Sequence, residues 1–185
     1  MPSDSHRVAI LCEFGSVNGG EHSLLALIPA IRDRGWDPVV VAPAVGELAD
    51  VLAARKIEHV DFSISDNRDN AVERLEELLE TCGAGLLHAN SLSMSRLSGR
   101  LARRTGRPTP GHLRDILNLS TAALEDINTN RRLLAVSHAT RDHHVAAGLD
   151  PDRTRVVYNG IDPAQFRNPV PVSYTHLTLP TSDLV

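Results

Sequence analysis

Short runs of apolar residues recur along the chain, and a polar or glycine-bearing segment follows each of them. Residues 8–12 contain no polar side chain, which is typical of a strand buried on both faces of a sheet. Comparable runs predict further strands at residues 38–42, 57–62, 86–89, 109–113, 133–136 and 154–158. The last run holds Val156, Val157 and Tyr158, β-formers that we expect to be buried.

The segments between these runs carry apolar residues at helical spacing. Leu24, Leu25 and Ile28 fall on one face of a helix over residues 21–34, and Gly35 is placed to end it. Further helices are predicted around residues 48–52, 72–82, 92–105, 121–127 and 137–147. Strands that alternate with helices favour right-handed crossovers, so we predict an α/β fold with a doubly wound parallel sheet of about seven strands. Ligands of such folds bind at the carboxyl ends of the strands.

The composition agrees with a single globular domain. Of the 185 residues, 42% are hydrophobic and 23% charged, which suits a chain with a core of its own. Only 3% are aromatic, so aliphatic side chains must build that core, as they do in parallel sheets between helices. The net charge of −4 argues against nucleic acid as a partner.

The cysteine pattern and the absence of long apolar runs bear on the compartment. Cys12 and Cys82 fall in a predicted strand and at a predicted helix end, so we expect reduced core residues rather than a disulfide. No apolar run approaches the ~20 residues of a membrane span, and residues 1–6 lack the pattern of a signal peptide. We therefore expect a cytoplasmic protein.

Residues 172–181 continue neither a helical nor a strand pattern. Their sequence, VSYTHLTLPT, resembles a translated reading frame of a sequencing-library adapter; the alternative is a natural Ser/Thr/Pro-rich linker. We predict a folded domain over residues 1–171 and a non-native or disordered tail over residues 172–185.

A glycine-bearing loop follows the first predicted strand. Gly15 and Gly20 have the spacing that opens a P-loop, but Glu21 and His22 stand where Lys and Ser or Thr are required. A nucleoside triphosphatase is therefore rejected, and no G-x-G-x-x-G dinucleotide fingerprint is present. What remains is the pair Gly19 and Gly20 before a helix, whose amides and dipole suit a diphosphate. The alternative is a flexible turn chosen for its geometry.

Four short motifs lie at the ends of predicted strands. They are Gly19-Gly20-Glu21 after the first strand, His112-Leu113-Arg114-Asp115 at the fifth, Val136-Ser137 at the sixth, and Asn159-Gly160-Ile161-Asp162 with Phe166 after the seventh. In this order they resemble the N-terminal domain of subfamily 4 glycosyltransferases, which have the GT-B fold. The match spans residues 7–166, and its specificity lies in order and spacing, since each motif alone is short.

The resemblance implies roles for individual residues. It places His112 beside the transferred sugar, as the catalytic residue of this half of the enzyme. It implies contacts with donor or acceptor for Gly19, Gly20, Glu21, Asn90, Arg114, Asp115, Ser137, Asn159, Gly160 and Asp162.

The resemblance also implies a reaction. A hexosyltransferase-like enzyme would transfer a sugar, with retention, from a nucleotide-diphosphate sugar to a hydroxyl of a sugar, lipid or small-molecule acceptor. The family's C-terminal donor-binding domain does not occur in these 185 residues, so we expect the fragment alone to be inactive. Protein groups, including helix N-termini, stabilise the leaving diphosphate in such enzymes, so we expect no cofactor and no essential metal.

Two other functions remain alternatives. One is a non-catalytic, doubly wound module that binds a small ligand at its loops. The other is a different GT-B enzyme, such as a sugar-nucleotide epimerase. The motifs of the second domain would separate these alternatives, because fold alone does not determine function.

Two polar clusters outside these motifs also have functional alternatives. His138, Asp142 and His143 offer one i,i+4 pair and no third ligand, so exposed polar residues are favoured over a metal site. Five arginines share one face of the fourth helix with no acid among them: Arg96, Arg100, Arg103, Arg104 and Arg107. We expect a solvated face; the functional alternative is peripheral contact with anionic lipid at the inner face of the membrane.

Overall fold

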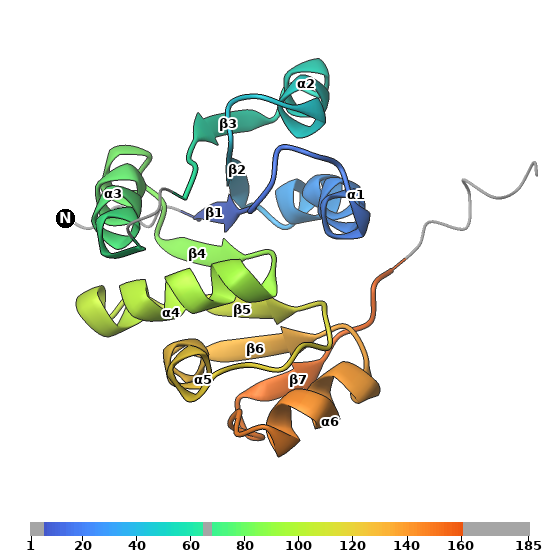
Figure 1. Ribbon diagram of the computed structural model, residues 1–185. Helices are drawn as coiled ribbons and strands as arrows, with labels where there is room; N and C mark the ends of the chain where they lie inside the picture. The colour runs from blue at the N-terminus through green and yellow to red at the C-terminus, as the bar shows by residue number, and fades with distance from the viewer. Residues whose placement is uncertain (1–5, 65–67, 161–185) are drawn as a thin grey trace, which may run out of the picture.

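Seven parallel strands form one sheet, with helices on both of its faces (Figure 1). The computed structural model describes residues 6–64 and 68–160. The strands are β1 (Arg7–Leu11), β2 (Asp37–Ala42), β3 (Glu58–Asp61), β4 (Leu86–Ala89), β5 (Pro110–Leu113), β6 (Arg132–Ala135) and β7 (Thr154–Val156). The helices are α1 (Gly19–Asp33), α2 (Glu47–Ala54), α3 (Arg68–Thr81), α4 (Leu92–Thr105), α5 (Thr121–Asn128) and α6 (His138–Ala146). The strand order β3-β2-β1-β4-β5-β6-β7 confirms the predicted doubly wound fold.

The helices divide unequally between the two faces of the sheet. Leu24 and Ile28 of α1 and Leu48 of α2 pack on one face, in a cluster with Val8 and Ile10 of β1. The opposite face carries α3 and α4, and α5 continues that layer over β5 and β6, in front of the sheet in Figure 1. The α1 face of β4, β5 and β6 is therefore left partly uncovered by the described helices.

The predicted elements all occur, but β7 differs from its prediction. It ends at Val156, and Val157 and Tyr158 are 46% and 66% exposed, so the expectation that they are buried is wrong. The reason is that β7 lies at the edge of the sheet, where β6 is its one partner among the described strands. The Val157 amide still donates to Ala135 O before the chain leaves the sheet. Asp162, Phe166 and the tail over residues 172–185 lie outside the described residues.

Helix α1 contains a proline in its interior and nevertheless continues to Asp33. Pro29 has no N–H to donate to the carbonyl of Leu25, one turn earlier. Arg55 fills this role, because its Nη1 donates to Leu25 O at 3.5 Å. A side chain from the end of α2 therefore compensates the bond that α1 lacks, and it ties the two helices of this face together.

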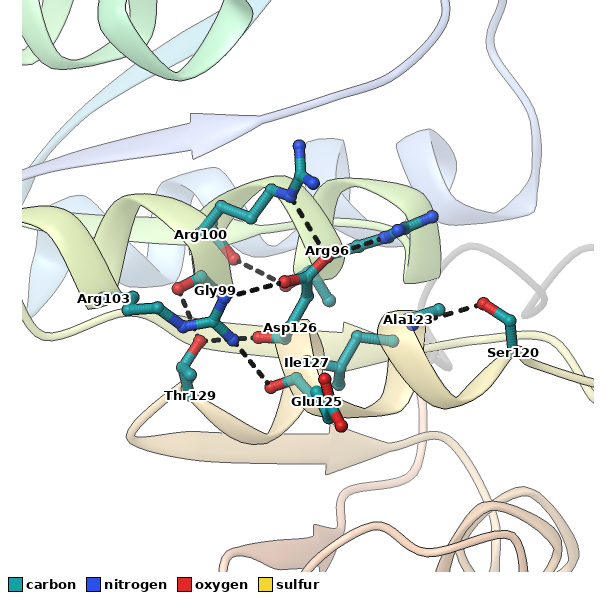
Figure 2. A network of polar contacts seen from close by, with 12 residues as sticks. Arg96, Gly99, Arg100, Arg103, Ser120, Ala123, Glu125, Asp126, Ile127 and Thr129 are labelled. Carbon is teal, nitrogen blue, oxygen red and sulfur yellow. Dashed lines mark hydrogen bonds and ion pairs between the residues drawn. The ribbon is translucent and has the colours of Figure 1, made fainter. Parts of the chain in front are cut away.

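The arginines of α4 do not form the solvated face that we expected. Arg96 Nε, Arg100 Nε and Arg103 Nη1 approach the Asp126 carboxylate of α5 at 2.9, 3.1 and 3.2 Å (Figure 2). The Asp126 side chain is only 7% exposed. Arg104 pairs with Glu73 and Glu76 of α3, and Arg107 donates to Ala84 O. The acids come from neighbouring helices, and lipid headgroups would have to compete with them.

Helices α4 and α5 touch at a glycine. A Cβ built on Gly99 would lie 1.8 Å from Asp126 O, and the Thr129 hydroxyl donates to Gly99 O. Only a residue without a side chain allows this approach, and so Gly99 and Asp126 together fix the junction of the two helices.

None of the described helices is long and apolar enough to span a membrane.

Candidate functional site

Arg114 lies at the centre of a polar cluster at the carboxyl ends of the strands. It follows β5, and its Nε and Nη2 donate to the backbone and side-chain oxygens of Asn90, after β4, both at 2.9 Å. Its Nη1 donates to Asn159 Oδ1, after β7, at 3.3 Å. One guanidinium therefore joins three segments that lie far apart in the sequence. Guanidinium has five N–H donors, so two of them remain for a ligand.

The first turn of α1 lies against this guanidinium. The helix begins at Gly19, so Gly19 and Gly20 form its first turn rather than preceding it as we expected. The amides of a first turn have no intrahelical partner. A Cβ on Gly20 would lie 3.3 Å from Arg114 Cδ and 3.6 Å from Asn90 Nδ2, whereas a Cβ on Gly19 would meet nothing within 4 Å. The close approach of helix and guanidinium therefore depends on Gly20.

Glu21 is the acid of the cluster, and it is buried, with 7% exposure. Its Oε2 accepts the backbone N–H of Asn18, which caps α1, and its Oε1 accepts Asn90 Nδ2 at 3.4 Å. A carboxylate in the first turn also suits the helix dipole. Glu21 therefore holds the helix end and orients Asn90, and the contact with substrate that we predicted for it stays a prediction.

Two histidines, the buried His112 and the half-buried His88, lie near Arg114 on the same face of the sheet. The rings of His88 and His112 meet edge to face at 5.7 Å between centroids. Burial, with Arg114 nearby, lowers the pKa of His88 to about 4. Burial, Arg114 and His88 lower the pKa of His112 to about 3. Both imidazoles are therefore neutral at pH 7.

The ring nitrogens of His112 are buried and have no hydrogen-bond partner among the described residues. A neutral imidazole has one donor and one acceptor nitrogen, so it can hydrogen-bond a hydroxyl in either sense. His88 was not among the residues predicted from the sequence. The available signal was alternation, since His88 on β4 and Asn90 just after it repeat the spacing of His112 on β5 and Arg114 just after it.

A groove of about 550 Å³ runs from Arg114 along the uncovered face of the sheet. Leu27, Ile31, Trp36 and Leu134 line it together with His112. The walls are mainly apolar and the polar cluster forms one end. Such a combination is the usual character of a small-molecule site.

Comparisons with known proteins agree with this arrangement. A model of Glycosyltransferase Family 4 matches residues 17–165. The chain belongs to this family. No curated protein matches it. The GT-B resemblance inferred from the four strand-end motifs is thereby confirmed.

Solved structures share the fold of this family 4 domain. HepE from Anabaena, in complex with UDP, has a TM-score of 0.71 at 23% identity, covering 86% of this chain and 46% of that one. A glycosyltransferase from Rickettsia africae has a TM-score of 0.71 at 16% identity, with coverages of 89% and 45%. A UDP-N-acetylglucosamine 2-epimerase from Rickettsia bellii has a TM-score of 0.58 at 14% identity, covering 83% of this chain and 44% of that one. The family 4 chain thus spans less than half the length of each.

Several predicted site residues of this family 4 domain lie apart from the Arg114 cluster. Asp115 is exposed, and its backbone oxygen accepts His144 Nε2 at 2.8 Å. Ser137 caps α6 by accepting the Thr140 amide at 3.1 Å. Gly160 is exposed at the end of the described residues. Their predicted contacts with substrate stay predictions, as does that of Asp162.

Other polar groups near the site have structural partners. Glu13, which was not predicted as a site residue, accepts a hydrogen bond from the hydroxyl of Ser91, the N-cap of α4, at 3.0 Å. Cys12 is a free, buried thiol; burial and the charge of Glu21 raise its pKa to about 12, so it stays protonated. Within residues 6–64 and 68–160, no group of three or more His, Cys, Asp or Glu side chains is placed to hold a metal ion.

Proposed function

We propose that this family 4 chain is the N-terminal, acceptor-side half of a cytoplasmic, retaining glycosyltransferase. In the proposal the enzyme transfers a hexose from a nucleotide sugar to the hydroxyl of a sugar, lipid or small-molecule acceptor. Family membership supports the class of reaction. Structures of similar fold include HepE with UDP and HepE with UDP-glucose, which supports a nucleotide sugar as donor.

The observation that carries the proposal is the bare first turn of α1 beside a fixed guanidinium. Gly20 allows Arg114 to lie against the first turn of α1, and the bonds to Asn90 and Asn159 hold Arg114 in place. Amides of a helix N-terminus and a guanidinium are the groups that stabilise a diphosphate leaving group without a metal. The arrangement is therefore suited to the charge that develops as the sugar departs.

His112 would act on the sugar rather than on the diphosphate. Its neutral ring cannot supply positive charge at pH 7, but its unpaired nitrogens can bind a hydroxyl. Because His112 lies in the groove that leads away from Arg114, a hydroxyl bound there would lie next to the leaving group. This is a positioning role that agrees with the place implied for it by the motif.

In this proposal the fragment alone is inactive. A diphosphate that meets only the Gly20 turn and Arg114 gains ~1–3 kcal/mol from charge-assisted contacts. Binding at micromolar concentration requires about 8 kcal/mol, so the fragment should bind donor at millimolar concentration or above. A second, donor-binding domain would supply the rest.

The test is to join residues 1–171 to the donor-binding domain that the proposal requires and to incubate the protein with a panel of nucleotide sugars and acceptors. The proposal predicts a glycosylated acceptor with the donor's anomeric configuration. An epimerase would convert the donor without needing an acceptor, and a binding module would change neither. Either of those outcomes rejects the proposal.

A further inference from the structure

A second hollow, of about 590 Å³, lies at the amino ends of β5, β6 and β7. Because the strands are parallel, this edge of the sheet is opposite to the one that carries Arg114. Four of the residues that line the hollow are arginines: Arg107, Arg131, Arg132 and Arg153. None of the described lining residues is acidic. Four cations thus gather in a chain whose net charge is −4.

Two of these arginines have structural partners. Arg107 Nη1 donates to Ala84 O, just beyond α3, at 2.9 Å. Arg153 Nη1 donates to Asn128 O, at the end of α5, at 3.0 Å, and its Nε pairs with Asp150. Cations near the carboxyl ends of helices are stabilising, so these contacts explain why arginine occurs at positions 107 and 153.

The other two arginines have no comparable partners in the described part of the chain. Arg132 Nη1 donates to Arg131 O at 3.4 Å. The Arg131 side chain makes no hydrogen bond or ion pair with any residue of the described ranges, and both side chains are exposed. Like charges that converge on one hollow repel each other. Neither helix capping nor an ion pair accounts for Arg131 and Arg132.

We propose that this hollow binds a compact anion that carries phosphate groups. Guanidinium groups bind phosphate oxygens through paired N–H donors, and several of them can surround one anion in a concave site. An anion of charge −2 or more would also relieve the repulsion among the four arginines. The ligand is either a free polyphosphate compound or the phosphate headgroup of a lipid. The site is separate from that of the proposed sugar transfer.

The probe for the free ligand is inorganic pyrophosphate, titrated into the whole chain at low ionic strength and followed by amide NMR shifts. We expect saturable shifts at Gly106, at Arg107 and at residues 129–132. Arg131→Gln with Arg132→Gln should weaken binding at these residues about tenfold or more, since two charge-assisted contacts are lost. Added salt should weaken binding in the wild type.

The matched control removes two charges outside the hollow. Arg32 donates to one backbone carbonyl, that of Lys56, and the Lys56 side chain makes no hydrogen bond or ion pair within the described ranges; both are exposed. Arg32→Gln with Lys56→Gln should therefore leave the pyrophosphate affinity unchanged. A thermal melt of each variant checks that the fold is kept.

A second arm separates the two sources of phosphate. Flotation with vesicles of phosphatidic acid, against vesicles of phosphatidylcholine, tests the lipid headgroup. Binding to phosphatidic acid alone, lost in the Arg131/Arg132 double variant, supports the site with a lipid as its ligand. Pyrophosphate binding without flotation supports a free anion. If neither probe binds, or if the double variant binds as the wild type does, the proposal is wrong.

Discussion

The chemistry of His112 depends on its surroundings more than on its residue type. An imidazole exposed to water has a pKa of about 6.5. Burial and the charge of Arg114 lower the pKa of His112 to about 3. The ring is therefore a neutral hydrogen-bonding group throughout the physiological range. This excludes a role as a general acid that depends on an imidazolium at pH 7.

The same shift predicts how stability depends on pH. The unfolded chain binds a proton to His112 near pH 6.5, whereas the folded chain does so only near pH 3, so acid favours unfolding between these values. From about pH 7 to about pH 5 this one histidine should lower the free energy of unfolding by about 2 kcal/mol. In urea titrations, His112→Leu should remove that part of the decrease.

The exposed His22 of α1 provides the control for this experiment. His22→Leu should keep the pH dependence of the wild type. If His112→Leu also keeps it, the ring of His112 is not buried and neutral in solution.

At the scale of elements, the junction of α4 and α5 depends on one carboxylate. Burial opposes ionisation of Asp126, but hydrogen bonds and charges of Arg96 and Arg100 outweigh it and lower its pKa. Its contribution to stability is thus present at neutral pH and is lost as the pH falls through the lowered pKa. Asp126→Asn should reduce the free energy of unfolding by about 2 kcal/mol, because three arginines lose their shared anion.

A surface ion pair serves as the comparison for Asp126. Asp142 pairs with Arg141 at 3.1 Å, but its side chain is 64% exposed. Asp142→Asn should therefore change the unfolding free energy by less than about 1 kcal/mol. Equal effects of the two substitutions in urea titrations would show that the Asp126 cluster is not buried.

The glycines of two helices provide another test at this scale. Gly99→Ala places a Cβ 1.8 Å from Asp126 O, so α4 and α5 must separate, and we expect a loss of about 3 kcal/mol or more. Gly19→Ala meets nothing within 4 Å in the first turn of α1 and should be neutral or stabilising. Thermal melts compare the two. A Gly99→Ala protein as stable as the wild type would contradict the close crossing.

The sequence predicts elements better than it predicts their side-chain partners. The periodicity of apolar residues is a local property of the sequence, and it predicts strands and helices. For this reason elements such as β1 and α4 occur at the predicted residues. The partners of Arg96 and Arg104 come from α5 and α3, and no local pattern contains that information. The same limit explains why the face of α4 was expected to be solvated.

The candidate site was predictable in part for the same reason. Gly20, Asn90 and Arg114 come together because each follows or opens an element at the carboxyl edge, as parallel topology requires. Ser137 lies at a strand end too, but it caps its own helix. The residues at the strand ends were predictable from the sequence. Which of them contact the Arg114 guanidinium depends on packing between elements and was not predictable.

At the scale of the whole molecule, the described chain presents two different edges. The carboxyl edge holds a neutral histidine pair, a bare helix turn and one guanidinium, and the amino edge holds four arginines. The chain spans less than half of the similar solved structures, among them HepE bound to UDP. In our proposal the carboxyl edge is therefore one wall of a site whose other wall belongs to a second domain.

The most direct test of this account is the rate of sugar transfer by Gly20→Val in the protein that joins residues 1–171 to the proposed donor-binding domain. The added side chain would displace Arg114 and cover the first-turn amides, so we predict a loss of kcat/KM of about 100-fold or more. His22→Leu, at an exposed position of the same helix, should retain activity within about threefold. Full activity of a folded Gly20→Val protein would contradict the proposed active site.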